Sequence, residues 1–255
     1  MRLLAALTFF TRLPFWRIRQ IPADAFKRVV PFWPLTGWLT GFTIALVFWL
    51  ASQVMPLTLA WILAIVARLL LTGCLHEDGL ADFIDGFGGG NSRERRLTIM
   101  KDSHIGTYGV IGLIVYFVLI LQLPSVISRD TLCMLVLCGD CWAKCCAAQL
   151  INLLSYARTE EEAKNKTVYE RMNWWETLIC VAAGLLPAYI MIFVLHWLPV
   201  SFCWLMLAPV AVMFLLALLM KRKIQGYTGD CCGATFLLCE LSLYLATLIA
   251  FPFWD

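Results

Sequence analysis

The sequence predicts an all-α bundle of about seven membrane-spanning helices, preceded by a short amphipathic helix that lies on the membrane surface. Of the 255 residues, 61% are hydrophobic and only 15% are charged, and the mean hydropathy is +0.79. This composition lies outside the range of ordinary soluble domains. Apolar runs recur along the chain, and basic residues gather in alternate connections between them, as in polytopic membrane proteins.

Each apolar run is close to the roughly 20 residues that a helix needs to cross a hydrocarbon core. Helices follow because lipid forces the backbone to satisfy its own hydrogen bonds. No internal repeat or soluble domain interrupts the pattern, so residues 1–255 read as a single integral membrane domain. The expected spans cover residues 34–52, 57–75, 105–123, 131–154, 177–197, 202–220 and 233–251.

The N-terminal segment, about residues 2–16, predicts the interfacial helix. Arg12 and Pro14 break its apolar stretch and no small-residue cleavage site follows, which argues against a signal peptide. Apolar residues recur at helical spacing and arginines flank them, as in helices that lie in the membrane interface. The apolar positions are Leu3, Leu4, Leu7, Phe10, Leu13 and Trp16.

The basic residues predict the orientation of the bundle. The N-terminal stretch and the connections at 76–104, 155–176 and 221–232 hold 17 of the 20 Lys and Arg residues. The positive-inside rule then places the N-terminus and these three connections in the cytoplasm. The net charge of +3 reflects this topology, so we expect membrane lipid and no nucleic acid among the partners.

A cluster of acidic residues is the strongest pointer to function. Asp78, Asp82 and Asp85 stand at i, i+4 and i+7 at the end of an apolar segment, so on a helix they share one face. Like charges repel at that distance, and ionisable groups at membrane depth are costly. Such a cluster indicates a bound cation or a reaction that requires it.

The three cytoplasmic connections together suit a phosphate-bearing substrate held through Mg²⁺. Hard carboxylate oxygens bind the ion, and glycine-rich backbone approaches phosphate oxygens. Asp78, Asp82 and Asp85 are the expected first ligands, with Asp102 or Asp230 completing the shell. The expected phosphate contacts are the glycines around Gly88 and Gly89 and the basic residues Arg93, Arg95, Arg96 and Lys101.

Structural roles remain open for several of these residues. Asp85 and Gly86 could form a helix C-cap and turn. Arg93, Arg95 and Arg96 could have no role beyond fixing the membrane topology. His76 could be a ligand, a base or an interfacial polar group. Trp33, near the start of a span, is expected to be an interfacial anchor.

Charged residues also fall inside the predicted spans. Asp140 and Lys144 stand four apart on one expected helix, so an internal ion pair is the simplest account. Arg68 and Glu240 have no such local partner. For these two, cross-helix pairing and a functional role are equally open.

Six stretches, in the same order from end to end, resemble the cobalamin synthase family. The two most specific are HEDGLADFIDG at 76–86 and MKDSHIGTYG at 100–109. The others are FFTRLP at 9–14, FWPLTG at 32–37, YAR at 156–158 and GYTGDCCGA at 226–234. The resemblance implies an Mg²⁺-dependent enzyme of vitamin B12 assembly in the inner membrane of a prokaryote.

The implied reaction joins adenosylcobinamide-GDP to α-ribazole or its 5′-phosphate, forms adenosylcobalamin or its 5′-phosphate, and releases GMP. His76 or a carboxylate, with Asp82 and Asp102 as candidates, would accept the proton of the attacking hydroxyl. Thr107 and Lys144 join the phosphate-binding set through this resemblance. The sequence leaves open whether the chain forms a homo-oligomer or joins a biosynthetic complex.

Three positions depart from the family pattern. Glu77 replaces a residue that is usually apolar, and His104 replaces a frequent arginine. Lys144 stands where arginine is frequent, which keeps the charge but loses the bidentate fork. The His104 change weakens the case for strong phosphate binding at that position.

Two alternatives compete with this interpretation. CDP-alcohol phosphotransferases also gather aspartates at one end of a bundle, but the Ala-Arg of their motif is missing after Gly86. A cation-coupled transporter would also carry an acidic ion site, usually near the bilayer midplane. Here the carboxylates fall at span ends, among Lys and Arg, which favours phosphate chemistry.

Overall fold

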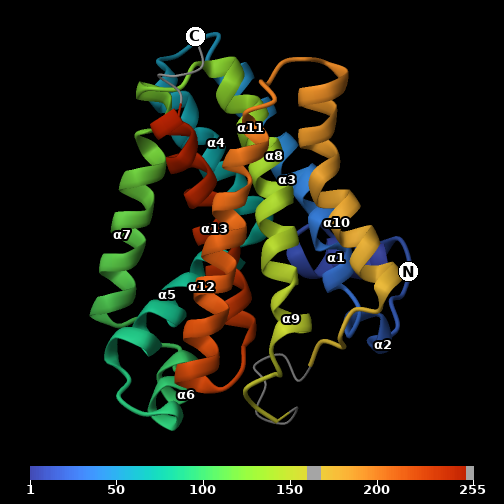
Figure 1. Cartoon of the computed structure of the whole chain (residues 1–255), viewed down its shortest axis with the longest axis vertical. Helices are drawn as coiled ribbons and strands as arrows, with labels where there is room; N and C mark the ends of the chain where they lie inside the picture. The colour runs from blue at the N-terminus through green and yellow to red at the C-terminus, as the bar shows by residue number, and fades with distance from the viewer. Residues whose placement is uncertain (160–167, 251–255) are drawn as a thin grey trace.

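The computed structural model describes residues 1–159 and 168–250, and that part of the chain is a bundle of helices (Figure 1). The long helices are α1 (Arg2–Phe10), α3 (Trp33–Ala51), α4 (Leu57–Thr72), α5 (Leu75–Gly89), α6 (Arg93–Lys101), α7 (Thr107–Leu121), α8 (Arg129–Ala148), α10 (Trp174–Tyr189), α12 (Leu207–Ile224) and α13 (Gly229–Ala250). The short elements are η1 (Phe15–Arg17), α2 (Ala23–Phe26), η2 (Val30–Phe32), η3 (Leu123–Ser125), α9 (Leu150–Leu153), η4 (Ile190–Val194) and α11 (Phe202–Leu205).

Six helical segments of the described residues are long and apolar enough to cross a membrane. They contain α3, α7, α8, α10, α12 and α13, and each matches a predicted span. The seventh predicted span, 57–75, is the 16-residue helix α4, which breaks and turns through 89° into α5. The all-α polytopic fold is therefore confirmed, with six candidate spans in the described residues, or seven if the bent pair α4–α5 counts as one span.

The break between α4 and α5 lies at Gly73 and Cys74, both of which adopt the left-handed conformation. Gly73 has φ +66, and a Cβ atom there would lie only 2.1 Å from the Arg12 Nε atom. Glycine is favoured here by the left-handed backbone conformation, and a larger residue would also displace the Arg12 side chain. The bend carries the acidic helix α5 away from the line of α4.

Helices α8 and α13 form the centre of the bundle. In their spans 72% and 67% of the residues are buried, against 28% for those of α7 and α12. Helix α3 comes close to α8 at two glycines: a Cβ on Gly37 would lie 2.9 Å from the Cys141 Cα, and one on Gly41 3.1 Å from the Leu137 Cα. Small residues thus let the two backbones approach, as in other membrane bundles.

The N-terminal helix is shorter than predicted. It ends at Phe10, because Thr11 is extended and Pro14 follows, instead of reaching residue 16. Ala5, Ala6 and Phe10 are buried against the bundle, whereas Leu3 is exposed. The helix therefore packs on the protein with one face and leaves Leu3 on the other.

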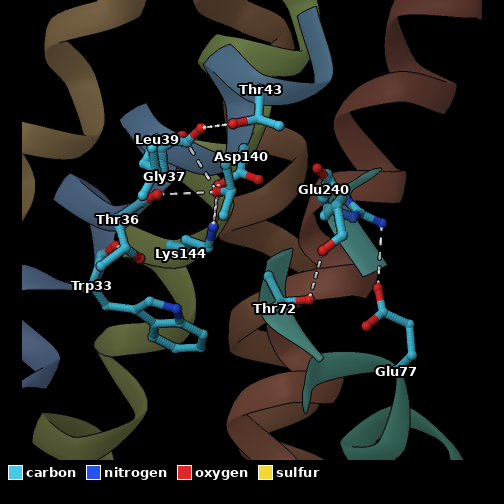
Figure 2. Close-up of polar contacts among 12 residues, drawn as sticks. Trp33, Thr36, Gly37, Leu39, Thr43, Thr72, Glu77, Asp140, Lys144 and Glu240 are labelled. Atoms are coloured by element: carbon cyan, nitrogen blue, oxygen red, sulfur yellow. Dashed lines mark hydrogen bonds and ion pairs between the residues drawn. The ribbon is translucent and has the colours of Figure 1, made fainter. Parts of the chain in front are cut away.

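The charged residues inside the spans are paired. Arg68 Nη1 donates to Glu240 Oε2 at 2.7 Å, and Arg68 Nη2 donates to the Tyr116 hydroxyl at 2.9 Å. Lys144 forms the predicted ion pair with Asp140 and also donates to Thr40 Oγ1 at 2.5 Å. Figure 2 shows Asp140 and Lys144 beside α3, with Glu77 and Glu240 in a separate group. Pairing lowers the cost of these buried charges.

Candidate active site

Helix α5 crosses the first turns of α13 at His76 and Gly79. A Cβ on Gly79 would lie 3.1 Å from the Asp230 carbonyl oxygen, and one on Gly233 would lie 3.3 Å from the His76 Cα. Glycines on both helices thus allow this close crossing. It brings Asp78 of α5 and Asp230 of α13 into the lining of one cavity.

Helix α13 begins at Gly229 because Thr228 caps it. The Thr228 hydroxyl oxygen accepts a hydrogen bond from the Cys231 N–H at 3.3 Å, as an N-cap residue does. The same hydroxyl donates to Asp230 Oδ2 at 3.4 Å. The turn-forming residues before Asp230 therefore set where its carboxylate lies.

A cavity of about 150 Å³ lies at this crossing. Asp78 is exposed, whereas Asp230 is only 9% exposed. The polar lining of the cavity consists of His76, Asp78, Arg158 and Asp230. Its aromatic and aliphatic lining includes Phe9, Phe10, Val30, Trp33, Leu75, Tyr156 and Tyr169.

His76 and Trp33 form one wall of this first cavity. Their rings stack at a centroid distance of 5.7 Å, and the Phe236 ring meets His76 edge-on at 4.7 Å. Each of the two residues is 2% exposed, so Trp33 is not the interfacial anchor that its position near a span end predicted. It is buried because α1 and α13 cover the start of α3.

The connections at 155–176 and 221–232 meet at the same end of the bundle, where Figure 1 places α5, α6 and α9. Tyr156 and Tyr227 form a parallel β-bridge, with the Ala157 N–H donating to the Tyr227 carbonyl at 2.8 Å. The Tyr227 N–H donates to the Ser155 carbonyl at 3.0 Å. Residues 160–167 of the first connection lie outside the described residues.

Arg93 joins α6 to both connections. Its Nε donates to the Ile224 carbonyl at 3.0 Å, and its Nη2 donates to the Ala157 carbonyl at 2.7 Å. In the opposite direction, Arg158 of the first connection donates to the Leu97 carbonyl of α6 at 2.8 Å. All three predicted cytoplasmic connections are therefore linked, and the guanidinium fork makes the link.

A second cavity of about 560 Å³ opens beside the first and shares Tyr156 and Arg158 with it. Arg93, Lys101 and Arg158 make its lining basic, with Glu94 the acidic residue among the lining side chains. Burial raises the pKa of Tyr156 to about 12, so its hydroxyl remains a neutral donor. A carboxylate-bearing cavity and a basic cavity thus share one wall.

Asp85 has a defined structural role. Its Oδ2 accepts from the Gly106 N–H at 2.7 Å and its Oδ1 from the Gly109 N–H at 2.8 Å, at the start of α7. The interpretation of Asp85 and Gly86 as a C-cap and turn is wrong, because α5 continues to Gly89. Whether Asp85 also binds metal stays a prediction.

The predicted glycine-rich phosphate loop is largely helical. Gly88 and Gly89 lie in the last turn of α5, and a Cβ on Gly88 would lie 2.8 Å from the Tyr108 ring. Both glycines are exposed. Close packing against α7 therefore explains Gly88, and its contact with phosphate stays a prediction.

The remaining predicted residues lie apart from the first cavity. Asp102 is exposed and accepts from the His104 backbone N–H at 3.0 Å, and that contact and the His104 ring lower the Asp102 pKa. Thr107 is exposed at the start of α7. Lys144 is buried in its ion pair, and Arg96 packs on Gly90. Of the two candidates to complete the shell, the fold brings Asp230 and not Asp102 to Asp78.

Within residues 1–159 and 168–250, no three His, Cys, Asp or Glu side chains are placed to hold one metal ion. The described site instead offers Asp78 and Asp230 at one cavity, with Asp82 one turn further along α5. Oxygen donors of this kind are those that Mg²⁺ prefers.

Comparison with known proteins identifies the family. The family model described as cobalamin-5-phosphate synthase matches residues 2–248. The chain belongs to the cobalamin-5-phosphate synthase family. Curated relatives named adenosylcobinamide-GDP ribazoletransferase include one from Shewanella amazonensis, 38% identical over 96% of this chain and 94% of the relative. Another, from Shewanella frigidimarina, is 36% identical over 95% of this chain and 92% of the relative. No solved structure matches the chain.

Membership of the cobalamin-5-phosphate synthase family makes the chain an integral membrane transferase of cobalamin biosynthesis. It therefore belongs to neither of the competing classes, the CDP-alcohol phosphotransferases and the cation-coupled transporters. The match covers the region of all six resembling stretches, so the resemblance is confirmed.

The two cavities of the candidate site contain residues that the sequence analysis does not assign to it. Tyr156 and Arg158 form the shared wall of the two cavities, and Trp33 and Phe10 line the first. All four lie in stretches that resemble the family, and this was the one available signal. Their chemistry becomes visible only when the connections meet.

Proposed function

We propose that this chain transfers the adenosylcobinamide phosphate group of adenosylcobinamide-GDP to α-ribazole or its 5′-phosphate. The observation that carries the proposal is the shared wall: a cavity with Asp78 and Asp230 adjoins a basic cavity with Arg93 and Lys101. Carboxylates beside cationic side chains suit phosphoryl transfer from a diphosphate. The names of the curated relatives support the choice of substrates.

In the proposed reaction a ribazole hydroxyl attacks the phosphorus on the cobinamide side of the diphosphate. The new bond joins that hydroxyl oxygen to phosphorus, and the bond from phosphorus to the bridging oxygen of GMP breaks. GMP leaves with the electron pair, and the hydroxyl proton passes to a carboxylate of the site or to His76. His76 is a candidate because it borders the cavity and neither ring nitrogen has a partner among the described residues.

Mg²⁺ fits this donor set. Proteins usually bind Mg²⁺ through one or two carboxylates together with substrate phosphates, so a complete protein cage is not needed. Asp78 and Asp230, which line one cavity, are the proposed ligands; Asp82 lies one turn further along α5, and Asp85 is bound to the start of α7. When bound, the ion would neutralise charge on the diphosphate.

The basic cavity would hold the diphosphate end of adenosylcobinamide-GDP. The guanidinium groups of Arg93 and Arg158 each donate to a backbone carbonyl, so both side chains are held in position before substrate binds. Lys101 is exposed in the same lining and adds a mobile charge. Tyr156 would donate its neutral hydroxyl at the wall between the two cavities.

We also propose that the end carrying α5, α6 and α9 faces the cytoplasm of a prokaryotic cell. The support is the distribution of Lys and Arg along the chain. Water-soluble nucleotide substrates would then reach both cavities directly. Cysteine accessibility from either side of sealed vesicles tests the orientation: Cys74, which is exposed beside α5, should react only with reagent on the cytoplasmic side.

The direct test of the function is turnover by the purified protein in detergent or liposomes. With adenosylcobinamide-GDP, α-ribazole and Mg²⁺, we expect equal amounts of GMP and a cobalamin, and no product when the metal is chelated. Release of GMP without a new cobalamin would indicate hydrolysis instead of transfer. Absence of both products from folded protein would overturn the proposal.

A further inference from the structure

The first cavity has an unusually aromatic wall. Phe10 and Trp33 stack at 4.9 Å with an interplanar angle of 8°, and Trp33 stacks in turn on His76. Phe9 and Tyr169 meet edge-on at 6.0 Å. Aligned ring faces and edges of this kind suit a flat aromatic ligand better than a sugar or a phosphate.

Two buried side chains at the cavity carry nitrogens without partners. Trp33 Nε1 and both ring nitrogens of His76 have no hydrogen-bond partner within the described part of the chain. Both residues border the cavity and are 2% exposed. Buried polar groups normally have hydrogen-bond partners, so we expect a ligand atom to form a hydrogen bond with at least one of these nitrogens.

The cavity volume limits which group can enter. About 150 Å³ matches a cavity that holds one benzene ring. A corrin macrocycle is far too large for this space. A guanine would need donors and acceptors along several edges, whereas much of this lining is apolar. A benzimidazole, which is larger than benzene by one fused five-membered ring and has a single acceptor nitrogen once ribosylated, comes nearest to both conditions.

We propose that this cavity binds the aromatic base of ribazole, a benzimidazole riboside, with the Trp33 N–H donating to the unsubstituted ring nitrogen. This inference rests on the proposed function. It divides the two substrates between the two cavities: the base of the acceptor enters the aromatic one, and the diphosphate of the donor lies in the basic one. The ribose would then lie near the shared wall of Tyr156 and Arg158.

Filling the cavity tests the assignment. Cys232 borders the cavity from α13 and is 7% exposed, so Cys232→Leu places a larger side chain in the space. We expect the KM for α-ribazole to rise by roughly tenfold or more, and by much more than the KM for adenosylcobinamide-GDP. Cys133→Leu, a half-buried position on α8 outside both cavities, is the matched control and should leave both KM values as they are.

A ligand comparison on the unaltered protein gives a second readout. Free benzimidazole should inhibit competitively against α-ribazole, and indole, which has the same shape without the acceptor nitrogen, should bind roughly tenfold more weakly. Calorimetric titration of the free base measures the same site without turnover. The titration therefore still tests base binding if the wild type releases no GMP. In that case the proposed function fails, and the calorimetric result alone decides whether the cavity binds the base.

Three outcomes would overturn the inference. The first is a rise in the KM for adenosylcobinamide-GDP alone in Cys232→Leu. The second is equal binding of benzimidazole by the wild type and a folded Cys232→Leu variant. The third is equal binding of benzimidazole and indole by the wild type.

Discussion

Asp85 holds Gly109 at the start of α7: its Oδ1 accepts the Gly109 N–H at 2.8 Å, while its Oδ2 accepts the Gly106 N–H. A carboxylate at this position satisfies two backbone donors that the helix itself leaves unpaired and lies at the positive end of its dipole. One of the clustered aspartates therefore ties α5 to α7. The remaining aspartates are the ones open to the cavity or close to it.

Asp85→Asn should destabilise the protein. One amide oxygen cannot replace two charged oxygens, and one N–H is left without its partner. We expect a loss of about 1–3 kcal/mol in the free energy of unfolding. Thermal unfolding in detergent measures this loss, and Asp78→Asn, at an exposed position, is the control expected to unfold near the wild-type temperature. Equal unfolding temperatures for wild type and Asp85→Asn would contradict the capping role.

Asp82→Asn and Asp78→Asn should abolish most turnover in proteins that still insert and purify. Removing a carboxylate weakens the proposed metal site without opening the bundle, since Asp78 is exposed and Asp82 half-buried. GMP release at saturating substrates and limiting Mg²⁺ is the measurement. Near wild-type rates for both variants would show that these carboxylates do not hold the metal.

Arg93→Lys should lower turnover although the charge is retained. Lysine cannot reach the Ile224 and Ala157 carbonyls together, because it lacks the planar fork. The two connections would lose their shared anchor, and the KM for adenosylcobinamide-GDP should rise several-fold. Arg95→Lys is the matched control, since Arg95 is exposed and lines neither cavity. Identical kinetics for the two variants would remove Arg93 from the site.

Glu240→Leu should cost about 3–5 kcal/mol of stability, because it leaves the buried Arg68 without its main partner. Tyr116 and the more distant Glu77, at 3.5 Å, cannot replace the lost carboxylate fully. The double variant with Arg68→Met should recover part of the loss: it removes the unpaired buried guanidinium, but it leaves Glu77 without its nearby cation. Unfolding temperatures of the single and double variants measure both effects. A double variant no more stable than the single would argue against this explanation.

Gly79→Ala should destabilise the crossing of α5 and α13. The added methyl carbon would lie 3.1 Å from the Asp230 carbonyl oxygen, and backbone atoms cannot easily move aside. Overpacking of this kind costs about 1–3 kcal/mol. Gly229→Ala is the control for stability, because a Cβ there meets nothing within 4 Å. A Gly79→Ala protein as stable as the control would mean that the helices separate without penalty.

The sequence predicted the class of fold because apolar length and charge distribution act locally. The Asp140 and Lys144 pair was predictable for the same reason, since four residues along a helix fix their proximity. The bend at Gly73 was not predicted: the apolar run continues to residue 75, and the close approach of Arg12 that accompanies the turn is a tertiary contact.

The candidate site was predicted in part. The aspartates of α5 share a face by spacing alone, but the pairing of Asp230 with Asp78 depends on how α5 and α13 cross. Asp85 could not be separated from its neighbours, because its backbone partners lie 21 and 24 residues further along the chain. The position of Trp33 near a span end predicts an interfacial anchor, whereas its burial depends on α1 folding back over it, which no local pattern indicates.

The central claim is that carboxylates of α5 and α13 act together on one divalent ion during transfer. Turnover as a function of Mg²⁺ concentration in Asp230→Asn tests it most directly, since Asp230 is the ligand supplied by the second helix. We predict that the half-saturating Mg²⁺ concentration rises by roughly tenfold or more in protein that remains folded. An unchanged Mg²⁺ dependence in a folded Asp230→Asn protein would contradict the claim.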